Sequence, residues 1–157
     1  CDESITAGRN FHTYTQGCPP HDWLYGTGGA IGRVLPEATG AAVACPDRKV
    51  LCLSGDGSAM YTVQALWTQA REGLDVTTVI FANRSYAILH GELLNVGAEP
   101  GPNTRAMFDL EEPALDWVQM ANGMGVEAER VDTAEGFHRA LEKGFNSEGP
   151  YLIEALI

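Results

Sequence analysis

Two short, continuous runs of apolar and β-branched residues most strongly limit the folds open to this chain. They are KVLCLSG at 49–55 and VTTVIFAN at 76–83, and neither shows the alternation expected of a strand with one face in water. Such runs are typical of strands in a parallel sheet, whose two faces are both covered. The segment between them, 58–73, has apolar residues at helical spacing and ends at a glycine. The pattern therefore predicts a strand, a helix and a second strand.

The rest of the chain continues this alternation. We expect a loop at 11–28, a helix at 30–44, a long loop at 91–112, a helix at 113–125, a strand at 126–131, a helix at 133–147 begun by Thr133, and a last strand at 150–157. Strands that alternate with helices predict an α/β fold, a doubly wound and mostly parallel sheet in three α/β/α layers.

Length and composition indicate one globular domain spanning residues 1–157. Hydrophobic residues make up 45% of the chain and charged residues 20%, so the chain has enough apolar residues to form a single core. It starts with Cys1 where a complete protein would start with methionine, so we expect a fragment of a longer, multidomain protein.

Charge and hydropathy narrow the expected partners and location. A net charge of −11 argues against nucleic acid, because phosphate recognition needs a basic face. No run reaches the roughly 18 apolar residues of a membrane span, and the N-terminus has no signal-peptide pattern. We therefore expect a cytoplasmic protein with neither nucleic acid nor membrane as partner. The four cysteines form no CxxC pair, so unpaired thiols are expected.

Two oxygen-bearing residues lie at the ends of the two central strands. Asp56 follows the first strand, between Gly55 and Gly57, and Asn83 closes the second. Because parallel strands end at the same edge of a sheet, and ligands bind at that edge, we expect the two side chains to meet. Mg²⁺ takes about six oxygen ligands, and carboxylate and amide oxygens suit it. The arrangement predicts a magnesium site.

The residues alone leave other interpretations open. An aspartate between two glycines is also typical of a tight turn. The stretch GTGGAIG at 26–32 is close to a dinucleotide-binding loop, although Ile31 stands where the third glycine belongs and no strong strand precedes it. A nicotinamide- or flavin-binding domain is therefore the weaker alternative.

The stretch GDGSAMYTVQALWTQA, with Asn83 following Gly57 after 25 intervening residues, resembles a known family of enzymes. It is similar to the thiamine-diphosphate enzymes of the acetolactate synthase, benzoylformate decarboxylase and pyruvate decarboxylase group. The resemblance covers essentially the whole chain, as the C-terminal diphosphate-binding domain, one of three domains in a subunit. It implies thiamine diphosphate and Mg²⁺ as cofactors.

The resemblance also implies roles for single residues. Asp56 and Asn83 match the side-chain magnesium ligands, and Ser85 matches a ligand that uses its backbone carbonyl. Positions along the diphosphate are matched by Thr6, Gly57, Ser58 and Tyr86. Gly29 matches a carbonyl that accepts from the 4′-amino group, Ile31 the apolar residue that bends the cofactor into a V, and Ile88 an apolar contact of the thiazolium.

Two positions depart from the family pattern, and one expected group is missing. Arg84 follows Asn83 where a second asparagine is common, and Leu89 stands where pyruvate decarboxylase-like members have a glutamate. The family's activating glutamate belongs to a pyrimidine-binding domain, of the same or a partner subunit, and nothing in this chain matches it. The catalytic residues within 1–157 are therefore unknown from the sequence.

The resemblance implies part of a 2-oxo acid carboligase or decarboxylase, similar to acetolactate synthase. A small 2-oxo acid would be the substrate, and a homodimer or homotetramer the assembly. The fragment by itself is expected to be inactive. The alternative is a catalytically silent domain of the same fold that serves in binding or assembly.

Overall fold

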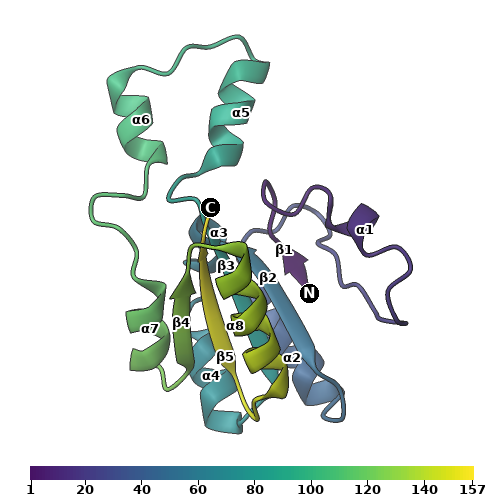
Figure 1. Cartoon of the computed structure of the whole chain (residues 1–157). Helices are drawn as coiled ribbons and strands as arrows, with labels where there is room; N and C mark the ends of the chain where they lie inside the picture. The colour runs from purple at the N-terminus through teal and green to yellow at the C-terminus, as the bar shows by residue number, and fades with distance from the viewer.

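A single parallel sheet organises the chain, whose residues 1–157 are all described by the computed structural model (Figure 1). The strands are β1 (Asp2–Glu3), β2 (Val50–Gly55), β3 (Val76–Ala82), β4 (Glu127–Val131) and β5 (Tyr151–Leu156), in the spatial order β1-β2-β3-β5-β4. All four neighbouring pairs run parallel. This confirms the predicted α/β class.

Helices cover both faces of the sheet and make the three layers (Figure 1). On one face, α2 (Val34–Ala44), α4 (Ala65–Glu72) and α7 (Trp117–Gly123) enclose a core built around the fully buried Leu35, Leu66 and Trp117. On the other face, α8 (Ala134–Asn146) packs over β3 and β5, and Phe11 of the one-turn α1 (Phe11–Tyr14) joins it. Burial on both sides explains why the central strands are so uniformly apolar.

The predicted helix ends at two places are confirmed by their geometry. Thr133 Oγ1 accepts a hydrogen bond from the Gly136 N–H at 3.2 Å and caps α8. Gly73 ends α4 with φ of +61°, a left-handed conformation that suits glycine.

The segment after β2 differs from the single helix predicted for 58–73. Asp56 itself opens a short helix, α3 (Asp56–Ala59), and α4 begins only at Ala65. Helical spacing of the apolar residues in 58–73 predicts that Met60, Leu66 and Trp67 pack in the core. This prediction is wrong for Met60, which is 38% exposed, and for Trp67, which is 53% exposed, whereas Leu66 is fully buried.

The prediction of a loop at 91–112 was also wrong. This segment contains the end of α5 (Ala87–Asn95) and all of α6 (Pro102–Phe108), and neither helix has a buried residue. The two helices project as an arm beyond the carboxyl edge of the sheet (Figure 1). Glycines and prolines in this segment suggested a loop, yet Pro102 is tolerated because it stands at the start of α6.

Smaller differences concern the boundaries of elements. The helix predicted from 30 begins at Val34, and the one predicted from 113 begins at Trp117. The two-residue strand β1 was not predicted at all. All four cysteines are free thiols, as expected. No helix has the length and apolar character that a membrane crossing requires.

Candidate functional site

Asp56 is a buried carboxylate with no cation beside it. The residue is 2% exposed and lies one step past the end of β2. Its Oδ1 accepts from the Gly57 N–H at 2.9 Å and its Oδ2 from the Arg84 N–H at 2.7 Å, but no Lys, Arg or His side chain pairs with it. Burial raises the pKa of Asp56 above its ordinary value, although the two backbone donors oppose that shift. A carboxylate in this setting lacks a positive partner.

A second acid contributes to this electrostatic setting. Glu154 of β5 is 1% exposed and adds a smaller rise to the pKa of Asp56 through its negative charge. Its own charge is met by Arg130, whose Nε donates to Glu154 Oε2 at 3.0 Å. Of these two buried acids, Asp56 is therefore the one without a cation.

The turn at 83–85 lies directly against Asp56. Asn83 Oδ1 accepts from the Ser85 N–H at 3.0 Å, which closes a local turn. The turn gives Arg84 a left-handed φ of +55° and directs its N–H to Asp56. Asp56 and the Asn83 turn, predicted to meet at the sheet edge, are thus joined by one hydrogen bond.

Residues 108–110 hold this turn from its other side. The Tyr86 N–H donates to the Phe108 carbonyl and the Leu110 N–H donates to the Arg84 carbonyl, both at 2.8 Å. Between these two hydrogen bonds, Ser85 forms an isolated antiparallel β-bridge with Asp109. No N–H donates to the carbonyl of Ser85. The Ser85 carbonyl is therefore an oxygen available to a further partner. The sequence did not indicate this role for residues 108–110.

Gly57 is required by its neighbours. A Cβ at this position would lie 2.5 Å from Cε1 of Tyr86, and the Leu110 side chain closes the same space. Tyr86 thus covers the backbone of α3, where Ser58 is 8% exposed. The structure brings Gly57, Ser58 and Tyr86 together beside Asp56.

The remaining predicted contacts lie on two loops and at the start of α5. Thr6 follows β1, which pairs with the end of β2, and is partly buried. Gly29 has φ of +65° and Ile31 is 50% exposed, both in the loop before α2. Ile88 is partly buried in the first turn of α5. No hydrogen bond joins these four residues to Asp56.

Glu3 anchors the loop before α2 and was missed by the sequence analysis. It is 8% exposed and its carboxylate accepts from the Gly32 N–H at 2.8 Å and the Val34 N–H at 3.4 Å. These are free N–H groups at the start of α2, so the negative charge also suits the helix dipole. Because β1 was not predicted, the sequence carried no signal for this role of Glu3.

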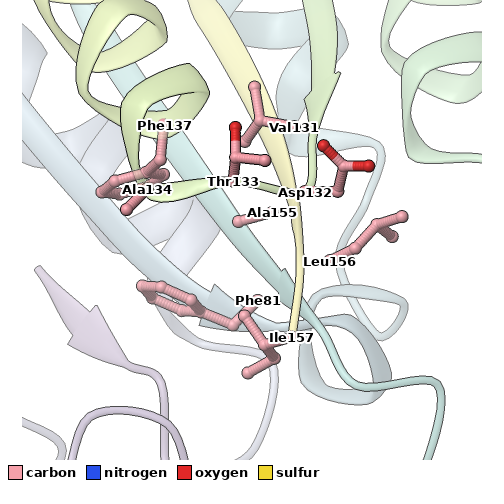
Figure 2. A pocket seen from close by; sticks show the side chains of 9 residues that line it. All are labelled: Phe81, Val131, Asp132, Thr133, Ala134, Phe137, Ala155, Leu156 and Ile157. Carbon is pink, nitrogen blue, oxygen red and sulfur yellow. The ribbon is translucent and has the colours of Figure 1, made fainter.

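The hollow in Figure 2 lies at the same edge of the sheet but on the side of α8. Its volume is about 240 Å³, and Phe81, Val131, Phe137 and the last residues of β5 line it. Asp56, Asn83 and Ser85 do not line it. The predicted metal ligands therefore lie outside this hollow.

The donor set fits a hard cation beside an anion. No three His, Cys, Asp or Glu side chains gather in the structure, so the edge offers one carboxylate, one amide and one free carbonyl. Such mixed oxygen sets, completed by substrate phosphates and water, are typical of Mg²⁺. The buried, unpaired Asp56 is the feature that a bound cation would explain.

Residues 6–155 match the family described as thiamine pyrophosphate enzyme, C-terminal TPP binding domain. The chain belongs to this family. Thiamine diphosphate, or thiamine pyrophosphate, is the cofactor of the thiamine pyrophosphate enzymes, and Mg²⁺ is its usual partner metal.

Three relatives illustrate the range of the thiamine pyrophosphate enzymes. IlvX of Mycobacterium tuberculosis, which carries a provisional assignment as an acetolactate synthase large subunit, is 54% identical over 99% of this chain and 31% of its own. Benzoylformate decarboxylase of Pseudomonas aeruginosa is 35% identical over 86% of this chain and 24% of its own. The structure of the thiamine diphosphate-dependent 4-hydroxybenzoylformate decarboxylase of Rhodococcus jostii RHA1 matches with a TM-score of 0.68 and 40% identity, over 79% of this chain and 22% of that one.

The chain spans less than a third of the length of these curated relatives. The likeness nevertheless extends along almost all of its own residues. It therefore corresponds to the C-terminal cofactor-binding part of such proteins.

Proposed function

We propose that the chain is the diphosphate-binding domain of a longer, multidomain thiamine-diphosphate enzyme that acts on small 2-oxo acids. All of residues 1–157 form this one domain. The observation that carries the proposal is the buried Asp56 carboxylate, which has no cation and is hydrogen-bonded to the turn that holds Asn83.

Asp56, Asn83 and Ser85 hold the magnesium ion in this proposal. Asp56 supplies the negative charge, Asn83 its Oδ1, and Ser85 the carbonyl that no N–H uses. Asn83 Oδ1 accepts one hydrogen bond, from Ser85, and a carbonyl oxygen has a second lone pair to offer. The turn therefore fixes these groups before the metal arrives, which lowers the cost of binding.

The cofactor lies along the same edge. Gly57, Ser58, Tyr86 and Thr6 line the diphosphate, while Gly29, Ile31 and Ile88 contact the rings. Thiamine diphosphate supplies, when bound, the reactive carbon and the place where electrons released on decarboxylation are stored. The chain's own part is to bind and orient, and Glu3 keeps the loop with Gly29 and Ile31 in position through Gly32.

A pyrimidine-binding domain, of the same or a partner subunit, covers the carboxyl edge of the sheet. Large apolar side chains are exposed around it: Ile31 at 50%, Tyr61 at 63% and Leu89 at 41%. Exposed apolar surface of this kind is typical of a protein interface. That domain would bring the activating glutamate, and the assembly would be a homodimer or homotetramer.

The chemistry is that of a carboligase or a benzoylformate decarboxylase-like enzyme. Leu89, at the position of a glutamate in pyruvate decarboxylase-like members, has no proton to transfer. The relatives named as acetolactate synthase and as benzoylformate decarboxylase both fit this assignment.

The experiment uses the full-length protein. Purified protein is mixed with thiamine diphosphate, Mg²⁺ and either pyruvate or benzoylformate, and carbon dioxide release is followed. Release that requires both cofactors supports an enzyme. Tight cofactor binding without release from a panel of 2-oxo acids would favour the alternative, a silent domain that serves in assembly.

A further inference from the structure

A second hollow lies at the outer edge of the sheet, on the far side of β1 from Asp56. It is lined by Asp2, Gly8, Arg9, His12, Trp23 and Tyr25, with a volume of about 370 Å³. Tyr25 forms an isolated parallel β-bridge with Asp2, and the Asp2 N–H donates to the Leu24 carbonyl at 3.1 Å. The segment at 23–25 therefore extends the sheet and forms one wall of the hollow.

Aromatic rings form much of that wall. Trp23 is partly buried, and the rings of His12 and His21 meet it edge-on, with centroids at 6.4 Å and 6.1 Å. These contacts hold the indole in place. Tyr25 is 73% exposed. A planar ligand could therefore be held between fixed and accessible aromatic surfaces.

The cation at this hollow is free. In a chain of net charge −11, most basic side chains are neutralised by an acid, as Arg33 is by Glu37 and Lys49 by Asp75. Arg9 forms no ion pair and no side-chain hydrogen bond. A free guanidinium is suited to a carboxylate, which it binds through two parallel hydrogen bonds.

Asp2 is the one acid in the lining, and its carboxylate is buried and hydrogen-bonded to Ser4. It is 6% exposed, and its Oδ1 accepts from both the N–H and the hydroxyl of Ser4, at 2.8 Å and 2.5 Å. Arg33 Nη2 also donates to the Asp2 carbonyl at 2.6 Å, but its charge is already paired with Glu37. Arg9 is exposed whereas Asp2 is buried, so the Arg9 guanidinium is the charge that a ligand in the hollow would meet.

We propose that this hollow binds a small aromatic carboxylate, with its ring against Trp23 and Tyr25 and its carboxylate on Arg9. A ligand of benzoate size leaves room within about 370 Å³. The site is separate from the magnesium edge and does not rest on the function proposed above.

Tryptophan fluorescence of the purified chain tests this site, with benzoate as the probe. The Trp67→Phe background removes the exposed indole on α4, and Trp117 is fully buried, so Trp23 becomes the accessible reporter. Saturable quenching by benzoate is expected. Cyclohexanecarboxylate, which lacks the aromatic ring, and benzamide, which lacks the charge, should each bind at least about tenfold more weakly.

Matched variants assign the effect to Arg9. Arg9→Gln should weaken benzoate binding about tenfold or more, while Arg139→Gln, another unpaired arginine exposed on α8, should leave it unchanged. Asp56→Ala should also bind benzoate normally, which separates this test from that of the magnesium site. Absence of saturable quenching, or equal losses in Arg9→Gln and Arg139→Gln, would overturn the proposal.

Discussion

At the scale of single residues, the candidate magnesium site has two energetically unfavourable features that a purely structural role does not require. Asp56 is buried without a cation, and Arg84 takes a left-handed backbone conformation that few residues with side chains favour. The asparagine common at position 84 in the family suits that conformation, because its short polar side chain is tolerated there. Such unfavourable features are typical of residues that serve binding, the role proposed for this site.

Replacing Arg84 by asparagine should therefore stabilise the domain. Arg84 is exposed, and the N–H that it donates to Asp56 is kept in the variant. We expect a gain of about 0.5–1 kcal/mol in the free energy of unfolding, measured by urea denaturation. Arg139→Asn, within α8, should instead lose up to about 0.7 kcal/mol. A loss of stability in Arg84→Asn would show that the left-handed turn is not strained.

Gly57→Ala should destabilise the domain through Tyr86. The new methyl group would lie 2.5 Å from the Tyr86 ring, so the ring has to move. Such overpacking costs about 1–3 kcal/mol, which denaturant unfolding can measure. Gly40→Ala is the control, because Gly40 lies exposed in α2 with open space around it, and it should gain stability. Equal effects at the two positions would contradict this packing.

The pKa of Asp56 should be raised in the metal-free protein. Burial disfavours its charged form, so carboxyl NMR should find its titration above the ordinary aspartate value, with Asp116 below that value because the Gln119 N–H donates to it. Since the folded state then holds the Asp56 proton more tightly than the unfolded state, this residue's contribution to stability falls as pH rises from the ordinary to the raised pKa. Mg²⁺ should lower the Asp56 pKa. An Asp56 titration at or below the ordinary value would contradict its burial without a cation.

At the scale of elements, sequence patterns predicted the sheet better than the helices that follow it. The strands β2 and β3 are recognisable because both faces are buried, and α8 because Thr133 and a strong amphipathic pattern define it. The pair α5 and α6 has no buried residue and hence no apolar stripe to detect. The break between α3 and α4 could not be predicted either, because the apolar residues on its two sides keep helical spacing.

The α5–α6 arm should open more readily than the sheet. Neither helix has a buried residue, and the two ends of the arm are joined to each other by the hydrogen bonds of Tyr86 to Phe108 and of Leu110 to Arg84. Hydrogen exchange should therefore be fast at the amides of α5 and α6 and slow in β3. Equal protection of α5 and β3 in the metal-free protein would contradict the expectation that an arm without buried residues opens readily.

At the scale of the whole molecule, the chain is organised around one edge of its sheet. The GDG stretch, the Asn83 turn and the loop with Ile31 come from three separate regions of the sequence, and the parallel strands bring their ends together there. Asp56 and Asn83 could be predicted because their positions follow from strand ends. The support from Glu3 and from residues 108–110 could not, because it depends on contacts across long stretches of chain.

The central claim is that Asp56 is a ligand of the magnesium ion that holds thiamine diphosphate. Calorimetric titration of thiamine diphosphate into the full-length protein, with and without Mg²⁺, tests it in the wild type, in Asp56→Ala and in the exposed control Asp132→Ala. We predict binding that requires Mg²⁺ in the wild type and the control, and a loss of affinity of at least about tenfold in Asp56→Ala. Mg²⁺-dependent binding of wild-type strength by a folded Asp56→Ala protein would contradict the claim.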